Sequence, residues 1–243
     1  MLKEVTGIVV STTNYGESSK ILNILTKDEI IGVISKGCRN LKSKNRNVSS
    51  NFIYGKFNIF YKENKLSTLI ECEVLDYFKN IREDITLISY LTYITELSKE
   101  VFKQSNDAEI FNLLISSIKK INNGFNPKVI TNILEVKLLD YLGVSLQIDE
   151  CVKCGSKNII TVSPYLGGYV CKNCMKNEKI VDAKTIKMLR LYYYVDIDKI
   201  SELKIKDNII EEINTFLSEY YDHFTGLYIK SKKFLKNINK INL

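Results

Sequence analysis

The chain of 243 residues is long enough for one large domain or two small ones, and its 35 basic and 28 acidic residues give a formal net charge of +7. It contains no run of about eighteen apolar residues, which argues against a membrane-spanning helix. Because His223 is the only histidine, neither a histidine metal centre nor a Ser–His or Cys–His catalytic pair is expected.

The first 80 residues have the pattern of β-structure. Short runs rich in β-branched and aromatic residues are separated by turn-like segments such as 14–17 and 27–29. Five short strands in this length predict a small closed barrel, with the OB-fold as the five-stranded candidate and an SH3-like barrel as the alternative. The predicted strands are Val5–Val10, Ile21–Thr26, Ile30–Ser35, Phe52–Tyr61 and Leu66–Val74.

A basic loop lies between the third and fourth predicted strands. Its five basic residues are accompanied by no acidic one: Lys36, Arg39, Lys42, Lys44 and Arg46. The chain has only four arginines among its 35 basic residues, and two of them are in this loop. The guanidinium group binds phosphate with a planar fork and stacks on bases, so the loop indicates contact with nucleic acid. A merely solvated basic loop is the alternative.

Aromatic residues follow this loop closely. Single-strand binders place bases on such rings beside a cationic groove. The alternation of a strand turns some of these rings inward, so at most one or two are expected to stack on bases. The candidates are Phe52, Tyr54, Phe57, Phe60 and Tyr61.

After Tyr77 the apolar period changes to that of a helix. One stripe runs from Ile88 to Val101, a second helix begins at the N-cap candidate Asp107, and a third begins at Asn126-Pro127. Helical patterns return from residue 182 and again from residue 207. These stripes predict the core of a helical bundle.

Four cysteines interrupt the helical pattern, in an insertion at about residues 148–180. Two C-x-x-C pairs separated by sixteen residues have the spacing of a structural zinc site, in which all four thiolates bind one Zn²⁺ and no position is left for substrate. Two disulfides are disfavoured because the N-terminus does not begin like a signal peptide. Iron in the same cage stays open. The ligands would be Cys151, Cys154, Cys171 and Cys174.

Several segments resemble, in order and spacing, the bacterial recombination mediator RecO family. The resemblance covers nearly the whole chain, although Cys38 stands where alanine is common and lysines replace several arginines of the family. The cysteine tetrad is not universal in that family, so it implies shape rather than activity. The matching segments are 5–10, 15–21, 36–39, 138–143, 163–168 and 227–235.

The resemblance implies an N-terminal OB-fold domain and a helical domain with a zinc insertion. It also implies binding of single- and double-stranded DNA, annealing of complementary strands, and action with RecR to load RecA on strands coated by single-stranded-DNA-binding protein. Family members grip the acidic, phenylalanine-ended tail of that coat protein through the helical domain. In this chain Lys128 and Lys137 are the candidates for the cationic rim of such a site.

The sequence therefore predicts an α+β protein, with an OB-fold nucleic-acid-binding domain over residues 1–80 and a helical domain over 81–243. We expect a non-enzymatic DNA repair and recombination mediator, cytoplasmic and associated with the bacterial nucleoid. The alternative function is a zinc-ribbon adaptor in transcription or translation. A metal-dependent hydrolase would need an open metal position and a general base, and the sequence offers neither.

Overall fold

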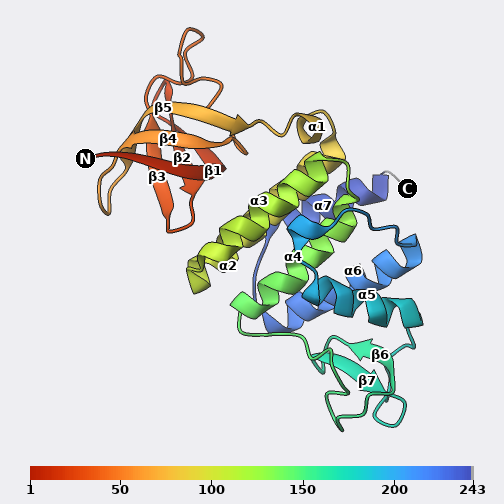
Figure 1. The fold of residues 1–243 in the computed structure, drawn as a ribbon. Coiled ribbons are helices and arrows are strands. Elements are labelled where there is room, and N and C mark those ends of the chain that lie inside the picture. The colour runs from red at the N-terminus through yellow and green to blue at the C-terminus, as the bar shows by residue number, and fades with distance from the viewer. Residues whose placement is uncertain (242–243) are drawn as a thin grey trace. The chain divides into compact units, whose positions relative to one another are not determined.

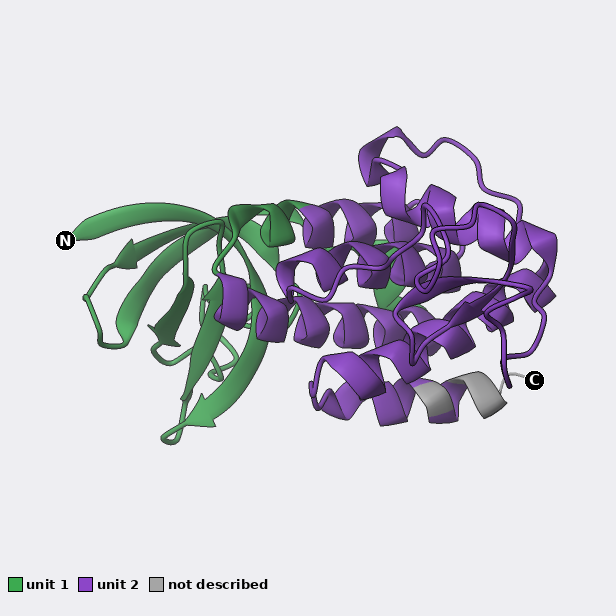
Figure 2. Cartoon of the chain, turned by 90° about the horizontal axis from the view of Figure 1, so that it is seen from below, with its two compact units in different colours: residues 1–84, 106–112 green, residues 85–105, 113–243 purple. Residues whose placement is uncertain are grey.

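The computed structural model describes residues 1–241. The chain forms two compact units (Figure 2). The first contains Met1–Asp84 and Asn106–Asn112, and the second contains Ile85–Ser105 and Leu113–Leu243. The short segment from residue 106 to 112 thus belongs with the N-terminal unit although it follows a long helix of the other one.

The first unit is a closed five-stranded barrel with the strand order β1-β2-β3-β5-β4 (Figure 1). Strand β1 closes it by pairing with both β2 and β4, and all pairs are antiparallel except β3 with β5. This topology confirms the predicted OB-fold over the SH3-like alternative. The strands are β1 (Leu2–Tyr15), β2 (Ser19–Leu25), β3 (Ile30–Ser35), β4 (Tyr54–Phe60) and β5 (Ser67–Asp76).

Two glycines allow the barrel to close tightly. Gly7 in β1 is the cross-strand partner of Gly55 in β4. A Cβ atom at Gly7 would lie 2.7 Å from the backbone oxygen of Leu25, and one at Gly55 would lie 2.6 Å from that of Glu73. Larger residues would therefore push neighbouring strands apart. Inside the barrel, apolar side chains such as Val9, Leu22 and Phe57 form the core.

The short helix α1 (Lys79–Arg82) follows the barrel in the first unit, and the later helices form the bundle predicted from the stripes, with the first turn of α3 assigned to the first unit. Helix α4 lies at the centre of the bundle, because it contacts α2, α5 and α6 and is buried on nearly every side. The helices are α2 (Ile85–Ser105), α3 (Ala108–Asn122), α4 (Pro127–Tyr141), α5 (Ala183–Tyr194), the 3-10 helix η1 (Ile197–Lys199), α6 (Asp207–Phe224) and α7 (Lys230–Ile241).

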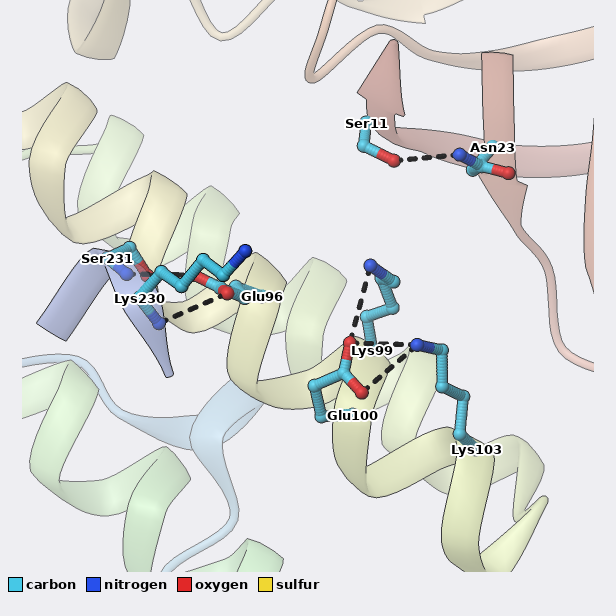
Figure 3. Close-up of polar contacts among 8 residues, drawn as sticks. All are labelled: Ser11, Asn23, Glu96, Lys99, Glu100, Lys103, Lys230 and Ser231. Carbon is cyan, nitrogen blue, oxygen red and sulfur yellow. Dashed lines mark hydrogen bonds and ion pairs between the residues drawn. The ribbon is translucent and has the colours of Figure 1, made fainter. Parts of the chain in front are cut away.

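Helix caps connect the sequence signals to the packing. The Asn126 side chain accepts hydrogen bonds from the N–H groups of Lys128 and Val129, with Pro127 at the first helical position, as predicted. Helix α7 is capped from another element. Glu96 of α2 accepts hydrogen bonds from the N–H groups of Lys230, at 3.2 Å, and Ser231, at 2.9 Å (Figure 3). This carboxylate therefore fixes the C-terminal helix against α2.

Between α4 and α5 the chain forms the cysteine insertion, which contains a hairpin of β6 (Ile159–Ser163) and β7 (Gly168–Cys171). Gly168 is required here, because a Cβ atom would lie 2.0 Å from the backbone oxygen of Gln147. The backbone of Gln147 donates to Gly167 and accepts from Tyr169, so the hairpin is bound to the segment that follows α4.

Candidate nucleic-acid surface and metal centre

The basic loop is anchored to the hairpin between β1 and β2. The N–H of Arg39 donates to the Ser18 carbonyl at 2.8 Å, and the N–H of Gly37 donates to the Ser19 hydroxyl at 3.1 Å. Successive turn hydrogen bonds, such as that from Asn40 to the Gly37 carbonyl, order the residues that follow. In an OB-fold the loop between strands 1 and 2 belongs to the nucleic-acid-binding region, so the basic loop lies beside a surface of that kind.

All five basic residues predicted in this loop are exposed. The structure brings Arg39 and Arg46 together, because Nη1 of Arg46 donates to the backbone oxygen of Arg39 at 3.2 Å and both residues line one pocket. Lys36, Lys42 and Lys44 lie elsewhere on the loop and do not line it. The two arginines thus form a local centre and the lysines surround it with further charge.

The pocket has a volume of about 560 Å³ and is lined wholly by residues of the first unit. Four cations border it and no carboxylate does. Three of the four are arginines, so all but one of the arginines of the chain meet here. The sequence assigned no role to the two cations outside the basic loop, because no local pattern places them beside that loop. The cations are Lys20, Arg39, Arg46 and Arg82.

Arg82 is held in place by backbone carbonyls. Its Nε donates to the oxygen of Tyr77 at 2.5 Å and its Nη2 to that of Asn51 at 2.8 Å. Partial burial lowers the pKa of this guanidinium. Among the described residues no ion pair involves the cations of the pocket, whereas Arg190 pairs with Asp149. In the part of the chain that the structure describes, these four cations thus have no direct carboxylate partner.

Of the five aromatic candidates, Phe60 is the most exposed, at 47%. Phe57 is fully buried in the barrel core, and Tyr54 packs against Phe78 and Phe111 with ring centroids 6.4 Å apart. Tyr61 donates a hydrogen bond to Glu29, and Phe52 is half-buried. Two exposed rings of the first unit were not among the candidates, namely Tyr15 and Tyr77, each 49% exposed, and Tyr77 lines the pocket.

The four predicted cysteines converge on one point. Their sulfur atoms lie within 4.8 Å of one another, and the Sγ atoms of Cys154 and Cys171 are 3.6 Å apart. Each pair lies in a tight turn: Gly155 N–H donates to the Cys151 carbonyl, and Cys174 N–H donates to that of Cys171. All four are free thiols, so the alternative of two disulfides is not what the structure contains. Four thiols at this separation can hold one metal ion.

The four thiols differ in their local electrostatics. Burial alone would raise the pKa of the Cys151 thiol, but N–H groups, that of Cys171 first among them, lower it to about 6. A hydrogen bond with Cys154 and burial raise the pKa of Cys174 to about 12. The backbone thus favours the thiolate of Cys151, and the thiolate is the form in which cysteine binds a metal ion.

The structure does not bring Lys128 and Lys137 together as a free cationic rim. Lys128 forms an ion pair with Glu211 at 2.6 Å. Lys137 donates to the backbone oxygen of Tyr193 at 3.0 Å, and burial lowers its pKa.

Within the described chain no helix combines the length and the apolar character that crossing a membrane requires.

The barrel with its arginine-lined pocket and the helical unit with its four-cysteine cluster define an OB-fold protein with an insertion that could hold one metal ion. Two family models match the chain and identify the family within this class of proteins. The model described as Recombination protein O N terminal matches residues 1–78, and that described as Recombination protein O C terminal matches residues 82–233. The chain therefore belongs to the RecO family of DNA repair proteins.

Curated relatives agree with this assignment over nearly the full length. The chain is 34% identical to DNA repair protein RecO of Bacillus pumilus over 247 residues, which cover 99% of this chain and 96% of that protein. It is 32% identical to DNA repair protein RecO of Bacillus subtilis, with the same coverage. The protein of that name from Listeria monocytogenes is 32% identical over 96% of this chain and 94% of its own length.

Proposed function

We propose that this protein binds single- and double-stranded DNA, anneals complementary strands and, with RecR, helps to load RecA onto strands coated by single-stranded-DNA-binding protein. The observation that carries the proposal is the group of cations without carboxylate partners on the barrel. Such charges are free to neutralise phosphates, which lowers the repulsion between two DNA backbones and lets base pairing proceed. Family membership supports this role over that of a zinc-ribbon adaptor.

The DNA-binding residues in this proposal are those of the basic loop, in a domain of residues 1–80. No catalytic residue is needed, because annealing is driven by base pairing; the protein acts as a mediator and not as an enzyme. The helical domain, residues 81–243, is the proposed docking site for the tail of the coat protein. The place of action is the bacterial cytoplasm, at the nucleoid. The loop residues are Lys36, Arg39, Lys42, Lys44 and Arg46.

The metal ion in this proposal is one Zn²⁺ with a structural role, held by the insertion at about residues 148–180. The fit rests on the donor set, four thiols from two tight turns, which is typical of structural zinc. With all four positions taken by Cys151, Cys154, Cys171 and Cys174, the ion stabilises the fold of the insertion and does not activate water.

Annealing of two complementary oligonucleotides, naked or coated with single-stranded-DNA-binding protein, tests the proposed function. The protein should accelerate both reactions, and the double variant Arg39→Ala/Arg46→Ala should be slower. The control Lys103→Ala/Arg190→Ala removes the same charge from ion-paired positions and should behave like the parent protein. If the protein accelerates neither reaction, the proposal is wrong. If it accelerates annealing of the naked strands only, the mediator role is wrong.

A further inference from the structure

A protein surface that binds only the phosphates of a DNA backbone needs no more than a row of exposed cations. The first unit also has a pocket with a floor, in which Cys38 is 2% exposed and Ile53 is 1% exposed. Its volume of about 560 Å³ is within the range of about 300–1,000 Å³ typical of small-ligand sites. The pocket therefore suits a discrete group rather than a length of backbone.

The chemistry of the lining selects an anion. Lys20, Arg39, Arg46 and Arg82 border the pocket without an acidic neighbour in its lining. Lys20 is oriented by a hydrogen bond from its Nζ to the Ser49 carbonyl at 3.0 Å. A phosphate matches the planar fork of arginine with paired hydrogen bonds, which makes it the anion that this cluster fits best.

Arg82 is the best organised of these groups. Two of its five N–H donors are used by the carbonyls of Tyr77 and Asn51, which fixes the plane of the guanidinium and leaves three donors free. The cost of its partial burial, seen in its lowered pKa, is relieved when an anion is bound. A side chain fixed in advance loses little freedom on binding, so Arg82 is suited to hold the ligand.

Tyr77 gives the pocket an aromatic wall. It is 49% exposed although it lies beside the buried Phe78, and its backbone oxygen is the acceptor for Arg82. The guanidinium is therefore tied to the backbone of Tyr77, and both residues line the same pocket. Phosphate and aromatic recognition side by side are what a nucleotide requires, because base–aromatic stacking adds to the charge contact.

We propose that this pocket binds a single nucleotide of single-stranded DNA, with its phosphate held by Arg39, Arg46 and Arg82 and its base stacked on Tyr77. The inference rests on the proposed DNA-binding function and adds a defined site to it. The exposed Lys36, Lys42 and Lys44 then hold the phosphates of neighbouring nucleotides. One nucleotide is turned out of the strand into the pocket, while the nucleotides on either side of it remain on the protein surface.

Calorimetric titration of the full-length protein with three small probes tests the site. Thymidine 5′-monophosphate should bind with a stoichiometry of one. Inorganic phosphate should bind more weakly, because it lacks the base, and thymidine should not bind at the same concentrations, because it lacks the charge. Equal affinity for phosphate and the nucleotide, or no binding of the nucleotide, overturns the proposal.

Two matched variants separate stacking from charge. Tyr77→Ala should weaken binding of the nucleotide about tenfold, as expected for the loss of one stacked base, and leave phosphate binding unchanged. Tyr15→Ala is the control, since Tyr15 is also 49% exposed in the same unit but does not line the pocket. Arg82→Gln should weaken both probes, and Arg190→Gln neither. If Arg82→Gln unfolds the barrel, the comparison of Tyr77→Ala with Tyr15→Ala still tests the site. Equal losses of nucleotide affinity in these two variants contradict the proposal.

Titration with a thymidine 20-mer distinguishes this site from the broader function. If the 20-mer binds and depends on Arg39 and Arg46 while the mononucleotide does not bind, the DNA-binding function stands and the pocket proposal is wrong. If neither ligand binds, both are wrong.

Discussion

At the residue scale, arginine and lysine have different roles in this chain. Arg190 forms an ion pair with Asp149, while Arg39, Arg46 and Arg82 are left without a carboxylate and meet at one pocket. Lysines supply most of the remaining positive charge on the surface. Because arginine binds phosphate through a rigid fork, its placement is a better indicator of the nucleic-acid surface than net charge alone.

Because of its buried tyrosines, the protein should lose stability as the pH rises in the alkaline range. Burial raises the pKa of Tyr169 and of Tyr220 to about 12, against an ordinary value of about 10. Above pH 10 the unfolded chain loses protons that the folded protein keeps, so the free energy of unfolding should fall as pH rises from about 10 to 12. Urea midpoints measured across this range check the prediction.

The variant Tyr220→Phe removes one of these ionising groups. Its stability should be lower at neutral pH, because the hydrogen bond from the Tyr220 hydroxyl to the Val144 carbonyl is lost, but its decline with pH should be shallower. Tyr228→Phe, at a position that is 81% exposed, is the control and should decline like the parent protein. Parallel curves for all three proteins would show that Tyr220 does not contribute.

The sequence could identify two of the four cations that line the pocket. Arg39 and Arg46 are recognisable because a rare residue recurs in a loop without acids. Lys20, Tyr77 and Arg82 are not, since they come from β2, from the residue after β5 and from α1, and only the folding of the barrel brings them to that loop. For the aromatic residues, the alternation of strand β4 implies that some rings point inward, but the burial of Phe57 depends on the three-dimensional core.

At the element scale, helix α7 depends on a contact far away in sequence. Glu96 supplies the acceptor for its first N–H groups and for the Ser231 hydroxyl at 2.5 Å. Glu96→Ala should therefore destabilise the protein by about 1–2 kcal/mol, the usual loss for a helix cap. Thermal unfolding measures this.

Glu100 provides the comparison on the same helix. It forms ion pairs with Lys99 and Lys103 on the partly exposed face of α2 (Figure 3). Such pairs contribute about 0–1 kcal/mol, so Glu100→Ala should have the smaller effect. A loss at Glu100 equal to that at Glu96 would mean that α7 is not held by the cap.

The cysteine insertion should contain one metal ion per chain, and elemental analysis should identify it as zinc. Cys174→Ser should lose the ion, whereas Cys72→Ser, which changes a cysteine of the barrel, should retain it. A chelator should unfold the insertion because metal binding stabilises it, while the barrel keeps its structure. Absence of metal with four titratable thiols contradicts the site, and strong visible absorbance would identify iron instead.

Elements were predictable where their signals are local. The caps at Asp107 and Asn126 are where the sequence indicates, because a capping side chain acts on N–H groups two or three residues away: Asp107 accepts from the Glu109 N–H, and Asn126 accepts from those of Lys128 and Val129. Strand β1 is longer than the predicted Val5–Val10, because it pairs with β4 along its first part and with β2 along its second. The short α1 has too few residues to show a period.

At the scale of the whole molecule, the barrel, the bundle and the insertion differ in their secondary structure and in their chemistry. The predicted fold class is confirmed because each part has its own sequence period: two in the strands, between three and four in the helices, and paired cysteines in the insertion. The assignment of residues 106–112 to the first unit was not predictable, because it depends on contacts such as that of Phe111 with Tyr54.

The central claim is that the cations of the basic loop bind a DNA strand. The most direct test is the salt dependence of affinity for a thymidine 20-mer. If the five loop residues each neutralise one phosphate, the logarithm of the affinity should fall linearly with the logarithm of the salt concentration. The slope should be about −3.5, because each phosphate contributes about −0.7. Arg39→Ala/Arg46→Ala should reduce the slope to about −2.1, with little change in melting temperature. An unchanged affinity and slope in the double variant would contradict the claim.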